Sequence, residues 1–238
     1  MDKAGKEAVL LFTRAPIPGK TKTRLQKLLT PEECAGLHTR FLMDLKICCE
    51  QTGVDYFVFL TPEGEDEKIA EIFGYNVKCL PQRGDSLGMR MHNAISEALS
   101  MGYGACVLMG ADIPEMRPRD IMAAFAILKD RDVVLGPTLD GGYCLVGMKE
   151  PCAAVFQNQT YGCGSVLENT TAAIESAGLT CGFIQAHGDI DEPEDILNYQ
   201  EKVGRKEISG KTHTSKYIAE LIGKYCIPNA ETSKSIRS

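Results

Sequence analysis

The residues between Arg14 and Arg24 combine positive charge with backbone freedom in a way that suits a polyphosphate ligand. Four cations follow an apolar run that ends at Phe12, and two prolines and a glycine lie among them. Proline restricts the path of a loop, glycine lets the backbone approach a ligand, and Lys and Arg offset phosphate charge. The residues predicted to bind phosphate are Arg14, Ala15, Pro16, Gly19, Lys20, Lys22 and Arg24. For this stretch alone, a solvated basic surface loop is the alternative.

Two carboxylates farther along the chain are candidate metal ligands. Asp112 follows a second apolar run, directly after Gly110, which opens space at the end of that run. A carboxylate opposite a cationic phosphate loop can hold Mg²⁺ or Mn²⁺ by oxygen ligation. Asp189 is the second candidate, because an expected helix cap at Asp191 and Glu194 explains the nearby carboxylates but not this one. For Asp112, the alternative is a residue that only caps the next turn.

Two further loops carry polar residues. In the first, Asp140 precedes Gly141, Gly142 and Tyr143, and two glycines allow a ligand to approach the backbone closely. A simple tight turn is the alternative for this loop. The second loop could contact a base or an acceptor, or could be only a helix cap with surface arginines; its candidate residues are Gln82, Arg83, Gly84 and Arg90.

The elements that must position these residues alternate along the chain. Continuous apolar runs predict strands at 8–12, 56–60, 77–80, 105–109, 132–135, 143–148 and 180–184, with helical patterns between most of them. Such strands indicate a mostly parallel, Rossmann-like sheet in a three-layer α/β/α arrangement, with ligands at the carboxyl ends of the strands. The loop after residue 135 is too short for a helical crossover, so we expect strand 143–148 to join antiparallel or to leave the sheet. The candidate residues follow four different strands, and we therefore expect them to meet at one edge.

Composition narrows the classes of partner. The chain has 238 residues, a net charge of −6, 44% hydrophobic and 24% charged residues, which is ordinary for a soluble protein and argues against nucleic-acid or membrane-surface binding. No stretch approaches the roughly 18 apolar residues of a membrane span, and the start lacks the apolar core of a signal peptide. The ten cysteines are scattered without zinc-ligand spacing. We expect reduced thiols in a cytoplasmic protein; the sequence does not indicate the oligomeric state.

Five segments, taken together and in order, resemble a bacterial family of GT-A-like transferases. These segments are Arg14–Gly19 with Lys22–Leu25, Gln82 with Leu87–Met91, Gly110–Pro114, Gly136–Pro137 with Asp140–Tyr143, and Asp189–Asp195. Members of this family have been described as glycosyltransferases associated with radical-SAM and arsenosugar genes. Their fold is similar to that of phospholactate guanylyltransferases and molybdenum-cofactor nucleotidyltransferases. The resemblance covers residues 8–199.

The resemblance implies a nucleotide-diphospho-sugar transferase fold over residues 1–204, followed by a helical extension and flexible tail over 205–238. It places Asp112 at the metal position, Lys20, Lys22 and Arg24 in the phosphate loop, and Asp140 to Tyr143 in an acceptor-side loop. Many members carry Trp-Ser where this chain has Tyr161-Gly162, and the chain contains no tryptophan. This departure concerns the choice of acceptor.

Together these features predict a transferase that depends on Mg²⁺ or Mn²⁺ and acts on a nucleotide and a small-molecule acceptor. Lys22, Arg24, Asp112 and Asp140 are the expected catalytic residues. Glycosyl transfer from a nucleotide sugar is preferred because of the resemblance alone, since the same cations and metal would serve nucleotidyl transfer with release of pyrophosphate. A non-enzymatic nucleotide-binding domain is a third possibility. A P-loop enzyme is a fourth, although Arg14 stands where that motif needs glycine.

Overall fold

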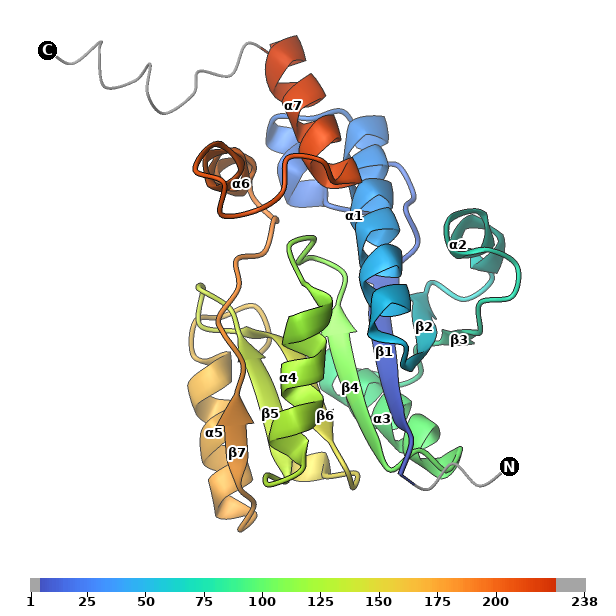
Figure 1. Ribbon diagram of the computed structural model, residues 1–238, viewed down its shortest axis with the longest axis vertical. Helices are drawn as coiled ribbons and strands as arrows, with labels where there is room; N and C mark the ends of the chain where they lie inside the picture. Colours follow the sequence, from blue (N-terminus) through green and yellow to red (C-terminus); the bar gives the residue numbers. More distant parts are fainter. Residues whose placement is uncertain (1–4, 226–238) are drawn as a thin grey trace, which may run out of the picture.

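Seven strands form one sheet in the computed structural model, which describes residues 5–225 (Figure 1). In chain order they are β1 (Glu7–Arg14), β2 (Asp55–Thr61), β3 (Cys79–Pro81), β4 (Ala105–Gly110), β5 (Val133–Pro137), β6 (Tyr143–Met148) and β7 (Cys181–Phe183). Their order across the sheet is β3-β2-β1-β4-β6-β5-β7, and every neighbouring pair is parallel except the two that include β6. The predicted mostly parallel α/β sheet is confirmed.

A tight turn explains the single antiparallel strand. The amide of Thr138 donates to the carbonyl of Gly142 at 3.0 Å, and Gly141 between them has a φ of +85°. A turn of this length joins antiparallel neighbours, whereas a parallel connection needs a crossover of a dozen or more residues. The first of the two predicted alternatives for residues 143–148 is therefore confirmed, and β6 lies between β4 and β5.

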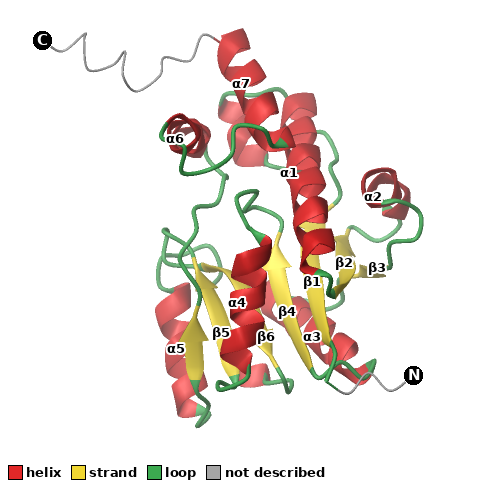
Figure 2. Ribbon diagram, in the orientation of Figure 1, coloured by secondary structure: helices red, strands yellow, loops and turns green. Residues whose placement is uncertain are grey.

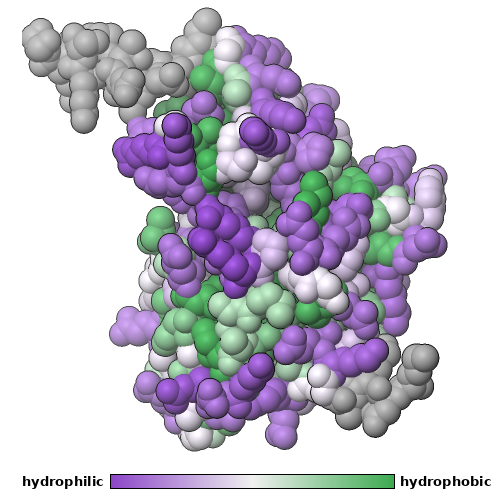
Figure 3. All heavy atoms as spheres, viewed as in Figure 1, coloured by the Kyte–Doolittle hydropathy of each residue, from purple (hydrophilic) through white to green (hydrophobic). Residues whose placement is uncertain are grey.

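Helices cover both faces of the sheet, which gives three layers (Figure 2). Helices α1 (Pro31–Thr52), α2 (Asp66–Phe73) and α4 (Pro118–Leu128) pack on one face, and α3 (Leu87–Ser100) and α5 (Val166–Ser176) pack on the other. Along β1, Val9 and Leu11 belong to the first core and Leu10 to the second, as the alternation of side chains in a strand requires. In Figure 3 apolar residues gather over α4, whereas the region over α1 and α6 (Pro193–Gly204) is mostly hydrophilic.

One of the two predicted helix caps is shifted by one residue. At α1 the expected capping box forms, with the amide of Glu33 donating to Thr30 Oγ1 at 3.2 Å. Helix α6 was expected to be capped by Asp191, but Glu192 is the N-cap, and its amide donates to the Asp195 carboxylate at 2.7 Å. Pro193 explains the shift, because proline favours the first helical position and thereby makes the preceding residue the cap. Asp191 is left outside the helix.

A third apolar cluster lies beyond the sheet. It joins the first half of α1, the short 3₁₀ helix η1 (Thr23–Lys27), α6 and α7 (His213–Tyr225). Helix α7 begins four residues before its predicted start at Tyr217, and its Ile218 and Leu221 are buried in this cluster. Figure 1 shows α7 beside α1. Residues 226–238, the last part of the predicted extension and tail over 205–238, lie outside the described residues.

Two observations concern the predictions about membrane spans and cysteines. Between residues 5 and 225 no helix is long and apolar enough to cross a membrane. In the same range nine cysteines are free thiols, and the tenth, Cys226, lies outside it. Another short 3₁₀ helix, η2 (Ala153–Val155), completes the elements.

The start of α7 gives a first prediction. The Asp44 carboxylate of α1 accepts the amides of His213 and Thr214 at 2.9 and 2.8 Å, which fixes the first turn of α7. Because a helix cap contributes about 1 kcal/mol, Asp44→Ala is expected to lower the free energy of unfolding by about that amount in urea denaturation. The control is Glu50→Ala, which removes the exposed Lys46–Glu50 pair and should cost no more than about 0.5 kcal/mol. Equal losses in the two variants would contradict a capping role.

Candidate active site

The predicted residues come together in a cleft of about 720 Å³ at the carboxyl ends of the parallel strands. Arg14 ends β1, Gln82 follows β3, Asp112 follows β4, and Asp189 follows β7. The strands thus deliver side chains that are far apart in sequence to one edge. Twelve of the predicted residues line the cleft: Arg14, Lys20, Lys22, Arg24, Gln82, Arg90, Gly110, Asp112, Asp140, Gly142, Tyr143 and Asp189.

Six predicted residues do not line the cleft: Ala15, Pro16, Gly19, Arg83, Gly84 and Gly141. Three of them instead shape the backbone around the cleft. Ala15 is buried and its amide donates to Thr61 O at 2.9 Å, which ties the loop to β2. Gly19 adopts a φ of +77° at the turn of the basic loop. The Gly84 carbonyl accepts from Arg90 Nε at 2.9 Å, so Gly84 orients a residue of the cleft wall.

Lys22 is buried and holds carboxylates rather than standing open for phosphate. Only 3% of its side chain is exposed, and its ammonium group forms an ion pair with Asp112. The same group donates to the carbonyl of Ile190 at 2.6 Å and lies 3.6 Å from Asp191 Oδ1. It also lies 5.4 Å from the centre of the Phe41 ring. The Lys22 charge is thus directed at Asp112 and at the acidic segment after β7, and a contact of Lys22 with phosphate stays a prediction.

The remaining cations of the basic loop fall into two groups. Arg24 donates to Asp191 Oδ2 at 2.8 Å and so fastens the loop to the segment before α6. Arg14 and Lys20 are exposed in the cleft, and neither forms an ion pair with any residue between 5 and 225. Of the four cations predicted to bind phosphate, Arg14 and Lys20 are therefore the ones that no described carboxylate pairs with.

The two predicted metal ligands both face the cleft. Partial removal from water works to raise the pKa of Asp112, but the Lys22 ammonium, helped by His38 and Arg14, outweighs this effect, and the pKa lies below its usual value. The Asp112 side chain remains 54% exposed. Burial raises the pKa of Asp189, and the nearby charge of Asp140 adds to the rise. In the described part of the chain no three His, Cys, Asp or Glu side chains gather closely enough to hold a metal by themselves.

The carboxylates nevertheless fit a divalent cation that takes its remaining ligands from substrate phosphates and water. Magnesium is usually bound by one or two carboxylates together with substrate phosphates and water, and a cage made wholly of protein ligands is not required. Asp112 and Asp189 supply two carboxylates at the same edge, and Asp191 is a third acid beside the Lys22 ammonium. Asp191 was assigned to a helix cap from the sequence; its place just before Pro193 was the signal that it lies outside the helix.

The geometry excludes a P-loop. After β1 the chain forms a loop and the short 3₁₀ helix η1, and α1 begins only at Pro31, so no α-helix starts directly after Gly19-Lys20-Thr21. The Thr21 hydroxyl is buried, donates to Ala15 O at 2.7 Å and accepts the amide of Ile17 at 3.2 Å. A P-loop needs that hydroxyl for its metal and backbone amides for phosphate.

The opposite wall of the cleft is the β5–β6 turn with the loop before α5. Asp140 Oδ1 accepts from Thr138 Oγ1 at 2.5 Å and from the amide of Gly142 at 3.1 Å, so this carboxylate also organises its own turn. The hydroxyls of Tyr143 and Tyr161 lie 3.3 Å apart, and burial raises the pKa of both. Tyr161 was not among the predicted site residues, although it marks the departure from the family pattern.

His38 is a second residue that the sequence did not indicate. It lines the cleft, although its side chain is almost wholly buried, with Nε2 3.1 Å from Arg14 O and 3.0 Å from Thr13 Oγ1. Burial lowers the pKa of His38 to about 4, so the imidazole is neutral at neutral pH. The side chain holds the end of β1, where Arg14 begins the basic loop. In the sequence it occupies an apolar helix face, where a histidine gives no sign of this role.

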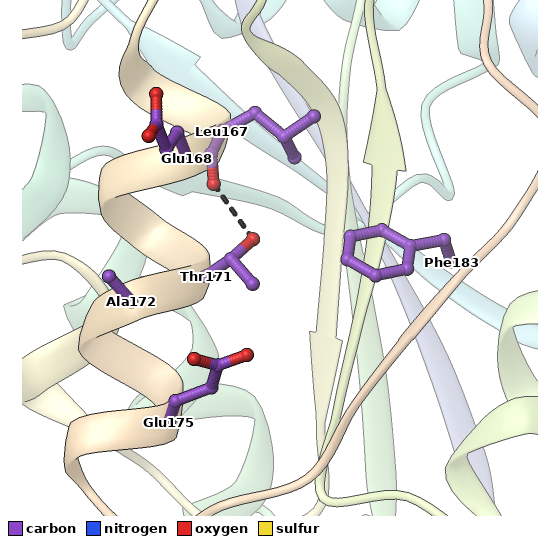
Figure 4. Close-up of a pocket in the computed structure, with 6 residues that line it drawn as sticks. All are labelled: Leu167, Glu168, Thr171, Ala172, Glu175 and Phe183. Atoms are coloured by element: carbon purple, nitrogen blue, oxygen red, sulfur yellow. Dashed lines mark hydrogen bonds between the residues drawn. The ribbon is translucent and has the colours of Figure 1, made fainter.

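A separate hollow lies between α5 and β7 (Figure 4). Phe183 points toward α5 there, and the Thr171 hydroxyl donates to the Leu167 carbonyl at 2.8 Å within the helix. Its six lining residues are Leu167, Glu168, Thr171, Ala172, Glu175 and Phe183, none of which is a predicted site residue. The cleft at the strand ends is therefore the candidate active site.

Comparisons with known proteins agree with this fold. The family model "Uncharacterized protein conserved in bacteria (DUF2064)" matches residues 45–163. A 3-phospho-D-glycerate guanylyltransferase from Phenylobacterium zucineum is 27% identical over 74% of this chain and 82% of its own length. A 2-phospho-L-lactate guanylyltransferase from Methanopyrus kandleri is 32% identical over 51% of this chain and 63% of its own length.

A solved structure agrees more closely over the whole fold. It is described as a nucleotide-diphospho-sugar transferase from Desulfovibrio desulfuricans G20, and it covers 94% of this chain and 99% of its own with 28% identity and a TM-score of 0.87. The predicted superfamily and fold are confirmed. The chain is a transferase enzyme, and the alternative of a non-enzymatic binding domain does not hold.

His38 gives a prediction for the pH dependence of stability. The pKa of His38 in the folded chain, about 4, is below that of an unfolded histidine. Its neutral form therefore stabilises the fold fully above about pH 6.5, and this stabilisation is lost as the pH falls toward 4. Between pH 7 and pH 5 this linkage removes about 2 kcal/mol from the free energy of unfolding. In His38→Gln, urea denaturation should show a correspondingly smaller loss over the same range. An unchanged pH dependence would show that His38 titrates normally in the folded chain.

Proposed function

The chain belongs to the DUF2064 family, and on this premise we propose that it is a nucleotidyltransferase that uses a nucleoside triphosphate and a small-molecule acceptor. In the proposed reaction an acceptor oxygen bonds to the α-phosphorus of the nucleotide, and the bond from that phosphorus to the leaving pyrophosphate breaks. The observation that carries the proposal is the cleft itself. There the unpaired cations Arg14 and Lys20 share one edge of the sheet with the carboxylates Asp112 and Asp189.

Asp112 and Asp189 would hold Mg²⁺ or Mn²⁺, with Asp191 as a further acid nearby. When bound, such an ion would neutralise part of the charge on the triphosphate. Lys22 has a different role, since its ammonium keeps Asp112 and Asp191 in place.

The chain's own residues divide the remaining tasks. Arg14 and Lys20 would bind the phosphates and stabilise the charge that grows on the leaving pyrophosphate. The turn from Asp140 to Tyr143, with Tyr161 beside it, would form the wall against which the acceptor lies. Gln82 lines the cleft while its amide group donates to Thr13 O and Phe59 O, both at 2.9 Å, so it would offer a fixed polar surface to the nucleotide.

Nucleotidyl transfer is preferred here over the glycosyl transfer expected from the sequence. Both curated relatives described above carry the name guanylyltransferase, which supports a nucleoside triphosphate, and in particular GTP, as the donor. Glycosyl transfer is the second candidate, because the protein from Desulfovibrio desulfuricans is described as a nucleotide-diphospho-sugar transferase. The two reactions need the same cations and the same ion, so their donors must be compared directly.

The comparison of donors gives a third prediction. A ligand at about 100 times its Kd stabilises a protein by about 2.7 kcal/mol, which for a chain of this size raises the melting temperature by roughly 5 °C or more. We expect this rise with GTP and Mg²⁺ or Mn²⁺, a smaller rise with GDP-sugars, and little with GTP alone. Asp112→Asn should fold and lose the dependence on the ion. A chain stabilised by GDP-mannose but not by any nucleoside triphosphate would contradict the proposal.

The unpaired cations give a fourth prediction. Lys20→Met removes a charge that no described acid neutralises, and it should raise the Kd for Mg²⁺–GTP about 10-fold in isothermal calorimetry. Lys27→Met is the matched control, because Lys27 lies nearby at the end of η1 but pairs with Glu192 at 2.8 Å and does not line the cleft. Its Kd should stay within about twofold of wild type. If both variants weaken binding equally, the effect reflects the general charge of the loop.

A further inference from the structure

A buried ionic cluster lies behind the segment that carries Asp189. The carboxylate of Glu115 forms an ion pair with Lys202 of α6, with distances of 2.9 and 3.0 Å from Nζ to its two oxygens. His187 Nδ1 lies 3.6 Å from the same carboxylate. Only 8% of the Glu115 side chain is exposed. None of these three side chains lines the cleft.

Glu115 also fixes the backbone on one side of Asp189. Its Oε1 accepts the amide of Gly188 at 3.2 Å. On the other side of Asp189, the amide of Ile190 donates to the carbonyl of Asp112 at 3.1 Å. The two amides that flank Asp189 are therefore both held by the loop that runs from Asp112 to Glu115. The positions of the two candidate ligands are linked through this pair of hydrogen bonds.

Lys202 keeps Glu115 charged and oriented. Burial alone would raise the pKa of Glu115, but His187, Lys202 and the Gly188 amide together lower it to about 2. The Lys202 ammonium lies so near the segment that a Cβ on Gly188 would stand 3.4 Å from it. A buried ion pair gains little net stability, because the cost of removing both charges from water offsets their attraction. What the pair does supply is a fixed acceptor for the amide of Gly188.

We propose that Glu115 and Lys202 are positioning residues that set the placement of Asp189 relative to Asp112 and thereby the affinity for the divalent cation. The inference rests on the proposed function, in which Asp112 and Asp189 hold that cation. Outer residues that orient metal ligands typically change metal affinity 10- to 100-fold when they are replaced. An equivalent effect is expected here, although neither side chain would touch the ion.

The test measures the Mn²⁺ concentration that half-saturates GTP binding, using the full chain and thermal shift as the readout. Glu115→Gln and Lys202→Met should each raise this concentration about 10-fold or more, with GTP affinity at saturating Mn²⁺ close to wild type. Lys202→Arg keeps the cation and should stay within about threefold of wild type. Should Glu115→Gln not fold, the two Lys202 variants decide, because that side chain is 29% exposed and tolerates replacement better.

The chain offers a matched control in Glu33. This residue also pairs with a lysine, Lys224, accepts a backbone amide, that of Thr30, and has its pKa lowered to about 2. It does not line the cleft. Glu33→Gln should therefore lose stability without changing the half-saturating Mn²⁺ concentration. A rise equal to that of Glu115→Gln would overturn the inference, because it would reflect lost stability alone.

The two proposals fail in different ways. Wild-type chain that binds Mn²⁺–GTP, together with Glu115→Gln and Lys202→Met variants whose half-saturating Mn²⁺ is unchanged, would overturn the positioning role and leave the proposed function intact. Wild-type chain that shows no Mn²⁺-dependent GTP binding would overturn both.

Discussion

The buried ammonium group of Lys22 joins the three segments from which the cleft is built. It belongs to the loop after β1, pairs with Asp112 after β4, and donates to the Ile190 carbonyl in the segment after β7. A buried charge is tolerated only when it is paired and hydrogen-bonded, and here one group meets a carboxylate, a carbonyl and the face of Phe41. The ammonium thus contacts Asp112 and Asp191 directly, and the carbonyl that it binds belongs to the residue after Asp189. These ion pairs and hydrogen bonds therefore hold the three segments together in the absence of a ligand.

The network also determines which charges remain for the substrate. The chain is acidic overall, with a net charge of −6, and the segment around Asp191 neutralises Lys22 and Arg24. Arg14 and Lys20 are left exposed in the cleft. A small polyanion such as a triphosphate suits two open cations opposite a pair of carboxylates better than it suits a broad basic surface. The same arrangement supports the transfer of a phosphorus-linked group, for which positioning and charge are the main requirements.

The sequence predicts the fold well because the strands are continuous apolar runs and ligand sites in such sheets lie at the carboxyl ends. The short loop after β5 also predicted β6 as a possible antiparallel neighbour. The sequence did not reveal which cations are neutralised, because Lys22 pairs with the distant Asp112 and hydrogen-bonds a residue 168 positions away, and Arg24 hydrogen-bonds a residue 167 positions away. Pro193 was the local signal for the start of α6, because proline favours the first helical position and so makes Glu192 the cap and leaves Asp191 outside the helix. His38 carried no local signal, because its contacts with the end of β1 form only when α1 packs on the sheet, and Tyr161 was marked only by its departure from the family pattern.

Product analysis tests the central claim most directly. The chain is incubated with Mg²⁺ or Mn²⁺, GTP and a panel of acceptors that includes 3-phospho-D-glycerate and 2-phospho-L-lactate, and in parallel with GDP-sugars and the same acceptors. The account predicts that pyrophosphate is released from GTP in step with formation of a guanylylated acceptor. Release of GDP from a GDP-sugar, with no pyrophosphate from GTP or any other nucleoside triphosphate, would contradict it.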